Sequence, residues 1–120
     1  FLLLFSGKRV DVPKGNIKEG ENSLQAAIRE LYEETGLTLN DIKIIDRFKE
    51  EVTIFYRFND DLIKKKITYF LCLTEKNEIK ISDEHDNYKW ATFDEAMNII
   101  KYKGLKEVIQ KAVEKLKSKQ

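Results

Sequence analysis

The chain has 120 residues, of which 42% are hydrophobic and 36% are charged, and its 22 basic and 21 acidic side chains leave a formal net charge of +1. This length suits one domain with one core, and the hydrophobic content excludes a disordered chain. The balanced charge gives no basic field for nucleic acid, and the single cysteine excludes an internal disulfide and a cysteine-rich zinc site. No apolar run approaches the ~20 residues of a membrane span. We therefore expect a single cytoplasmic domain over residues 1–120, with no membrane or specific nucleic-acid partner.

The first third of the chain is predicted to hold a strand, a loop and a helix. Residues 1–5 are expected to form a buried strand, and because the chain starts directly in it, we expect a further N-terminal strand to be missing from the chain. Residues 8–20 are expected to form a glycine-bearing loop. Asn22 and Gln25 predict a capping box, and Gly36 suits the position that ends a helix. Apolar side chains with helical spacing are expected to face the core: Leu24, Ala27, Ile28 and Leu31.

The remainder of the chain is predicted to be strand-rich and then helical. Strand candidates are residues 42–48, 52–58, 67–74, 78–81 and 88–91. Asn59-Asp60-Asp61 predicts a turn, and Thr92 with Glu95 predicts a second capped helix. Gly104 interrupts this pattern before a last helix, whose apolar face is Leu105, Val108, Ile109, Ala112 and Leu116. Strands flanked by a central and a C-terminal helix predict an α/β layered domain.

The densest group of potential ligands lies on the central helix. Glu30, Glu33 and Glu34 have the spacing i, i+3, i+4, which places them on one helix face. Their repulsion is relieved by water or by cations, and Mg²⁺ prefers carboxylate oxygens. A merely solvated acidic face is the alternative. The preceding loop favours the metal, because Lys14 and its glycines suit a bound phosphate. Metal and phosphate together indicate phosphate-ester or pyrophosphate chemistry.

The same region carries a longer pattern. Gly15 is followed at fixed spacings by Glu21 and by Arg29-Glu30-Leu31-Tyr32-Glu33-Glu34-Thr35-Gly36-Leu37. This resembles the complete Nudix box, G-x5-E-x7-R-E-U-x-E-E-x-G-U with U aliphatic, and every fixed position is filled. The resemblance implies a Nudix α/β/α sandwich with a mixed, partly antiparallel sheet, in which the box forms a loop–helix–loop. It also implies hydrolysis of a nucleoside diphosphate linked to another moiety, by water that a metal activates.

The resemblance implies a role for each residue of the box. Glu30, Glu33 and Glu34 would bind Mg²⁺, with Mn²⁺ as the alternative ion, and Glu33 and Glu34 would also act in catalysis. The Gly15 carbonyl would be a further ligand. The residues implied to be structural are Glu21, Arg29 and Gly36. In this reading the arginine pairs with a glutamate and orients it.

Outside the box, nearly the whole chain resembles the asymmetrical diadenosine tetraphosphate hydrolases of prokaryotic type. The similar segments are residues 1–5, 13–16, 68–70, 82–90, 93–96 and 102–106. In that subfamily a tyrosine of the sheet and an aromatic residue near the C-terminal helix flank an adenine. The implied substrate-binding residues are Lys14, Tyr69, Tyr102 and Lys103. A half-buried strand residue is the alternative for Tyr69, and a solvated side chain is the alternative for Lys103.

A further glutamate is implied to complete the metal site or to act as the base. Glu84 is the favoured candidate, and Glu51 is its competitor. His85 is interpreted as a structural hydrogen-bonding residue. The run Lys64-Lys65-Lys66 predicts a solvated hairpin arm or a region that steers polyphosphate. Core positions are expected for Cys72, Trp90 and Phe93.

The chain departs from the subfamily in the loop before the box. Asn16 replaces the histidine of animal members, and Val10-Asp11-Val12 stands where an aromatic residue often precedes P-K-G. The expected function is cleavage of diadenosine tetraphosphate to ATP and AMP by a monomer or homodimer. The alternatives are another Nudix activity, on ADP-ribose, a nucleoside triphosphate or capped RNA, and a silent Nudix module that binds nucleotides or a protein.

Overall fold

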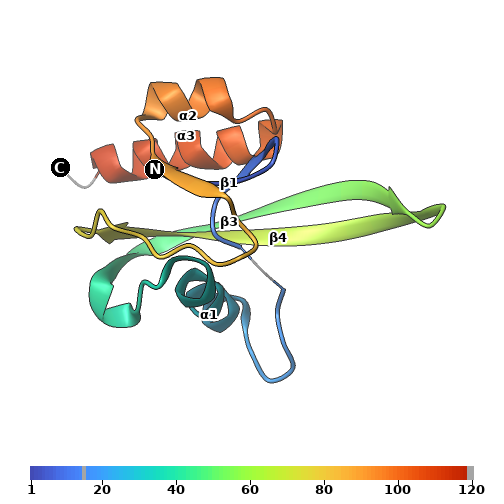
Figure 1. Cartoon of the computed structure of the whole chain (residues 1–120), viewed down its shortest axis with the longest axis horizontal. Helices are drawn as coiled ribbons and strands as arrows, with labels where there is room; N and C mark the ends of the chain where they lie inside the picture. The colour runs from blue at the N-terminus through green and yellow to red at the C-terminus, as the bar shows by residue number, and fades with distance from the viewer. Residues whose placement is uncertain (15, 119–120) are drawn as a thin grey trace.

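Helices lie on both sides of the strands in the computed structural model, which describes residues 1–14 and 16–118 (Figure 1). Helix α1 (Ser23–Thr35) lies on one side of the long hairpin, and α2 (Phe93–Ile99) and α3 (Lys103–Ser118) lie on the other. The strands are β1 (Leu2–Ser6), β2 (Arg9–Asp11), β3 (Ile42–Phe58), β4 (Asp61–Thr74) and β5 (Asn87–Trp90). A short 3-10 helix, Leu39–Asp41, precedes β3. This arrangement confirms the predicted α/β/α class.

The described strands form two sheets. One has the order β2-β1-β5, and the other is the β3-β4 hairpin. The three pairings are antiparallel, with Leu4 opposite Asp11 in one ladder and opposite Tyr88 in the next. Strand β2 lies inside the segment that the sequence predicts as loop. It forms because its three residues pair with the end of β1 after the chain reverses at Gly7.

Helix α1 begins and ends where the sequence predicts. The Asn22 side chain accepts a hydrogen bond from Gln25 N at 2.8 Å, and the Gln25 side chain accepts one from Asn22 N at 2.9 Å. Gly36 has φ 78° and donates its N–H to Tyr32 O at 2.8 Å, as in a left-handed helix end. The helix therefore presents the residues of the box on a rigid, well-capped element.

The predicted strands 42–48 and 52–58 are one continuous strand. The pairing register of β3 with β4 changes between Ile44 and Lys49, and Arg47 in this interval has φ 61°. A local irregularity within the strand thus replaces the predicted break. Asn59 and Asp60 both have positive φ, at 51° and 67°, which suits a tight hairpin turn and confirms that turn. Strand β4 starts earlier than predicted, because the lysines 64–66 pair with residues 53–55 of β3.

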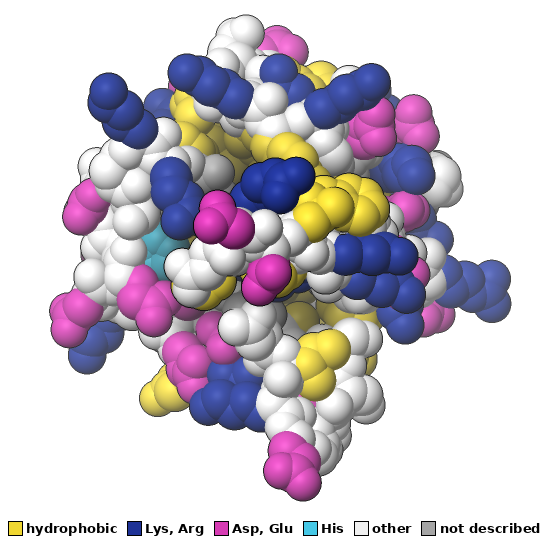
Figure 2. Space-filling view, turned by 90° about the vertical axis from the view of Figure 1, so that its right-hand side faces the viewer, with side chains coloured by type: hydrophobic (Ala, Val, Ile, Leu, Met, Phe, Trp, Pro, Cys, Tyr) yellow, Lys and Arg dark blue, Asp and Glu magenta, His cyan; other side chains and the backbone are white. Residues whose placement is uncertain are grey.

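The far end of the hairpin projects from the body of the molecule. Phe55, Phe58 and Leu62 are 62–64% exposed there. Figure 2 views this end and shows basic and acidic side chains interspersed with exposed hydrophobic ones. Lys64 and Lys66 are exposed on the ribbon and Lys65 is half-buried, and no single-sign charge patch covers the face seen in Figure 2.

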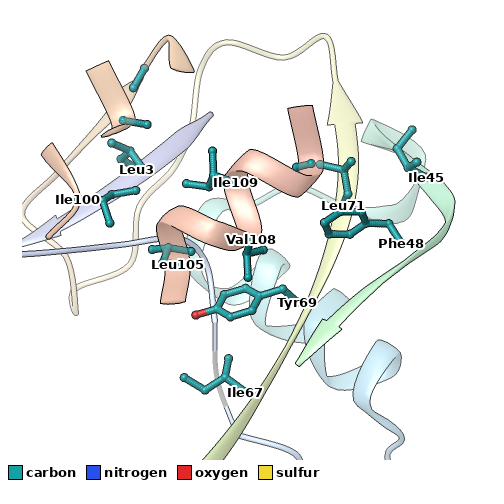
Figure 3. Packing of buried hydrophobic residues seen from close by; sticks show 13 residues of the cluster. Leu3, Ile45, Phe48, Ile67, Tyr69, Leu71, Ile100, Leu105, Val108 and Ile109 are labelled. Atoms are coloured by element: carbon teal, nitrogen blue, oxygen red, sulfur yellow. The ribbon is translucent and has the colours of Figure 1, made fainter. Parts of the chain in front are cut away.

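The core lies between α3 and the strands. Leu3, Phe48, Ile67, Leu71, Ile100, Leu105, Val108 and Ile109 pack there, with Tyr69 among them (Figure 3). Gly104 lies in the first turn of α3 instead of interrupting a pattern. A Cβ at this glycine would lie 2.8 Å from Val52 Cγ1, so close packing explains the residue.

Three further expectations differ from the structure. Trp90 is 38% exposed and its Nε1 donates to Asn77 O at 2.8 Å, so the predicted core position is wrong. Residues 78–81 form no strand, although Lys80 N donates to Thr35 O at 3.0 Å and thereby joins this segment to the end of α1. Cys72 is half-buried and Phe93 packs partly buried against the core.

None of the described helices has the length and apolar character that a membrane span requires.

Candidate active site

Arg29 of α1 is the centre of a group of carboxylates. Its Nε and Nη2 donate to the two oxygens of Glu21 at 2.7 and 3.1 Å. Its Nη1 donates to Glu30 at 2.6 Å and to Glu33 at 3.1 Å, and Nη2 also donates to Asn16 O at 2.7 Å. One guanidinium thus joins three carboxylates of the box to the loop before it. Hydrogen bonding to Arg29 is the main reason that the pKa of Glu21 is lowered.

Glu34 lies apart from this guanidinium in a buried position. Its side chain is 6% exposed, and Oε2 accepts the main-chain N–H of Lys14 at 2.7 Å. Burial raises the pKa of Glu34 to about 7, although the Lys14 hydrogen bond opposes the shift. The negative charges of Glu30, Glu84 and Asp11 raise it further. Carboxylates of α1, of β2 and of the segment before β5 thus all act on Glu34.

This group fits a hard divalent cation by its donor chemistry. Mg²⁺ and Mn²⁺ bind carboxylate oxygens, and Glu34, whose pKa is raised first by burial and then by nearby negative charges, is a carboxylate that a cation would stabilise in its charged form. Within residues 1–14 and 16–118, no three acidic, histidine or cysteine side chains are already gathered into a ligand set. Arg29 binds Glu30 and Glu33 in this arrangement. The predicted ligand Gly15 lies outside the described residues.

The structure distinguishes the two candidates for the additional glutamate. Glu84 is near enough to Glu34 to raise its pKa. Glu51 instead forms an ion pair with Lys66 Nζ at 3.1 Å on the exposed hairpin. Of the two, only Glu84 contributes to the raised pKa of Glu34, so it stays the favoured candidate.

We expect Glu84→Gln to lower kcat by about 10²-fold or more, which is the usual contribution of a positioned acid or base. The matched variant Glu51→Gln should change kcat less than about twofold, because it breaks only an exposed ion pair. Steady-state kinetics at saturating metal would test both. A larger loss in Glu51→Gln would reverse the assignment.

A cavity of about 480 Å³ is lined by residues of α1, β4 and α3 and of the loop that carries Lys14, and none of the four glutamates is in its wall. Its wall includes Lys14, Asn16 and Tyr69 together with the apolar stripe of α1, Leu24, Ala27, Ile28 and Leu31. These four side chains are only partly buried, because they line a cavity instead of packing fully into the core. The cavity is thus largely apolar, with Lys14, Lys65 and Lys66 as cations on its wall.

The predicted substrate-binding residues are only partly brought together. Tyr69 is 8% exposed, packs near Leu105 and Val108, and lines the cavity (Figure 3). Tyr102 is 42% exposed at the start of α3 and does not line it, and Lys103 beside it is exposed. Burial mainly raises the pKa of Tyr69, and Asp11 and Tyr102 raise it further.

Two features of the site could not be read from the sequence pattern. Asp11, on β2, forms an ion pair with Lys14 Nζ at 2.7 Å, and only the departure from the subfamily at residues 10–12 drew attention to this segment. His85 Nδ1 is buried and has no hydrogen-bond partner among the described residues, so the structure gives this atom no bracing role.

Comparison with known proteins places this geometry in a family. The chain matches the NUDIX domain over residues 4–112. It belongs to the NUDIX domain family. The asymmetrical bis(5'-nucleosyl)-tetraphosphatase of Mus musculus is 35% identical over 100 residues, covering 82% of this chain and 65% of the mouse protein. This chain thus spans slightly less than two thirds of that relative.

Other NUDIX proteins extend the comparison. An RNA pyrophosphohydrolase of Vibrio cholerae is 33% identical over 96 residues, covering 68% of this chain and 55% of that protein. A crystal structure of a C. elegans Ap4A hydrolase in a binary complex has a TM-score of 0.86 and 30% sequence identity, and covers 98% of this chain and 86% of that chain. The resemblance identified in the sequence is therefore confirmed for both the family and the fold.

Proposed function

We propose that this protein is a Mg²⁺-dependent hydrolase of dinucleoside polyphosphates that cleaves diadenosine tetraphosphate to ATP and AMP. The buried Glu34, held by Lys14 N–H beside a largely apolar cavity, is the observation that carries the proposal. The similarity to the mouse and C. elegans proteins named for this activity supports the substrate class. We infer cytoplasmic action on a small nucleotide, by a monomer or homodimer.

In this proposal metal binding, ligand orientation and proton transfer are assigned to different side chains. Glu30, Glu33, Glu34 and Glu84 would hold the divalent ion, which when bound neutralises phosphate charge and lowers the pKa of water. Arg29 fixes two of these carboxylates. Glu84 or Glu34 takes the proton of the attacking water while the new bond to phosphorus forms. The bridging oxygen then leaves with the departing nucleotide.

The cavity and Lys14 account for binding in this proposal. Lys14 provides a positive charge for a phosphate on the path between the carboxylates and the apolar wall. Tyr69 and the apolar stripe of α1 offer the contacts that a nucleoside base requires. A base held at a fixed distance from the carboxylates leads to attack on one particular phosphorus, so that a symmetric substrate is cut asymmetrically.

A hydrolysis screen with product identification tests the proposal. Diadenosine tetraphosphate, ADP-ribose, nucleoside triphosphates and 5'-triphosphorylated RNA would each be supplied with Mg²⁺ or Mn²⁺. We expect diadenosine tetraphosphate to be cleaved fastest, to ATP and AMP, with ¹⁸O from labelled water in only one product. Two ADP molecules would contradict the asymmetric attack. Faster cleavage of another substrate would change the substrate class, and nucleotide binding without turnover would indicate a silent module.

Tyr102→Ala tests whether an adenine stacks at the start of α3. Stacking on an aromatic side chain contributes ~1–3 kcal/mol, so we expect KM for diadenosine tetraphosphate to rise roughly 5–150-fold with little change in kcat. Tyr102→Phe keeps the ring and should preserve KM. An unchanged KM in the alanine variant would place the base elsewhere, with Tyr69 and the cavity as the remaining aromatic wall.

A further inference from the structure

Lys14 is held at two points by two different elements. Its main-chain N–H donates to Glu34 Oε2 of α1 at 2.7 Å, and its Nζ lies 2.7 Å from Asp11 Oδ2 of β2. The other oxygen of Asp11 accepts from Val12 N at 2.9 Å, so this carboxylate is itself fixed. The Lys14 and Asp11 side chains are only 33% and 25% exposed, which reduces the screening of their charges by solvent.

Asp11 is joined to the carboxylate group through Lys14, whose Nζ it binds and whose main-chain N–H binds Glu34. Its charge contributes to raising the pKa of Glu34 and also that of Tyr69. Lys14 lines the same cavity as Tyr69. Lys14 therefore connects the buried carboxylate of Glu34 with the wall of the cavity.

We propose that Asp11 is a positioning residue, which holds the Lys14 ammonium where it meets the phosphate next to the nucleoside. This inference rests on the proposed function. An ammonium has three N–H donors, so it can bind a phosphate oxygen without leaving Asp11. A lysine that is already ordered loses less side-chain entropy on binding than a free one. Asp11 thus acts on substrate affinity, through Lys14, and not on the chemical step.

A double-mutant cycle separates this role from a structural one. Asp11→Asn, Lys14→Met and the double variant would be compared on the nucleotide that the wild type hydrolyses fastest. We expect KM to rise about tenfold in Asp11→Asn, roughly the value of one charge-assisted hydrogen bond. The kcat should stay within about twofold, and the double variant should be no worse than Lys14→Met alone. Asp11→Glu should restore part of the affinity.

Two controls make the outcome unambiguous. Asp46→Asn removes the same charge from an exposed position and should leave KM unchanged. Independent KM effects of Asp11→Asn and Lys14→Met would overturn the proposal, because Asp11 would not act through Lys14. A fall in kcat together with a lower Tm in Asp11→Asn would also overturn it, since that result describes a structural residue.

A second measurement needs no turnover and remains valid if the proposed function fails. Competitive acetylation with acetic anhydride, followed by mass spectrometry, compares Lys14 with the exposed Lys101. Asp11 lies 2.7 Å from Lys14 Nζ and limits the access of reagent to it, so Lys14 should react several-fold more slowly in the wild type than in Asp11→Asn. Equal rates in the two proteins would show that Asp11 does not hold the ammonium. If Lys14 were labelled slowly but the protein hydrolysed no nucleotide, the role of Asp11 in holding Lys14 would stand and only the proposed function would be refuted.

Discussion

Replacing Glu34 by glutamine is expected to reduce kcat by about 10²–10⁴-fold, the range for loss of an essential acid or base. Glutamine has nearly the same shape and retains an oxygen that can accept the Lys14 N–H, so the loop should remain in place. The variant removes the one carboxylate of the group that is almost fully buried. It should therefore lower both turnover and the response to added Mg²⁺.

The same variant should not destabilise the metal-free protein. Burial raises the pKa of Glu34 from its usual 4.5 to about 7 in the folded state. The folded protein therefore binds the proton more strongly than the unfolded chain does, and wild-type stability falls as pH rises from about 4.5 to about 7. Glu34→Gln lacks this ionisation. Its Tm relative to wild type should increase across that interval in the presence of a chelator.

Glu107→Gln is the matched control, because Glu107 is an exposed residue of α3. It should leave kcat, the Mg²⁺ response and the pH dependence of Tm unchanged. If Glu34→Gln kept near-normal Mg²⁺-dependent activity, Glu34 would have no place in the metal site. If instead its Tm collapsed at every pH, the charge of Glu34 would be a structural requirement.

The parts of the site that depend on nearby residues could be predicted from the sequence. Helical spacing placed Glu30, Glu33 and Glu34 on one element, and local capping residues located both ends of α1. These signals are local because a helix is stabilised by contacts between residues a few positions apart. The spacing of the glutamates alone could not distinguish a metal site from a solvated acidic face. The resemblance to the Nudix box favoured the metal site.

The parts that depend on distant residues could not be predicted in this way. The hydrogen bond between Lys14 and Glu34 joins β2's loop to α1, and the proximity of Glu84 to Glu34 joins a loop near β5 to the same helix. Strand β2 has only three residues and depends on pairing with β1. The partial exposure of Trp90 similarly depends on a distant residue, because its indole N–H donates to the main-chain carbonyl of Asn77. Periodicity carries no information on such contacts.

Arg29→Lys should cause the other large loss, because it keeps the charge but removes the geometry. The guanidinium uses separate nitrogens to bind Glu21 on one side and Glu30 with Glu33 on the other. A single ammonium cannot span these partners and the Asn16 carbonyl at once. Residues that orient metal ligands typically contribute 10–100-fold to activity or metal affinity. We expect a loss of about that size in kcat at limiting Mg²⁺, with a lower Tm.

Two control variants test whether the loss in Arg29→Lys comes from the contacts of Arg29 with the glutamates, and not from replacing any arginine by lysine. Arg57→Lys alters an exposed arginine with one long contact, Nη1 to Asp60 O at 3.4 Å, and should have no effect on kcat or Tm. Glu21→Gln removes the negative charge and one of the two oxygens that accept from Nε and Nη2, so it should share part of the Arg29→Lys defect. The double variant should then be little worse than Arg29→Lys, since the two residues act as one unit. Additive losses would mean that Glu21 and Arg29 support the site separately, and an unchanged kcat in Arg29→Lys would show that the carboxylates are oriented without the guanidinium.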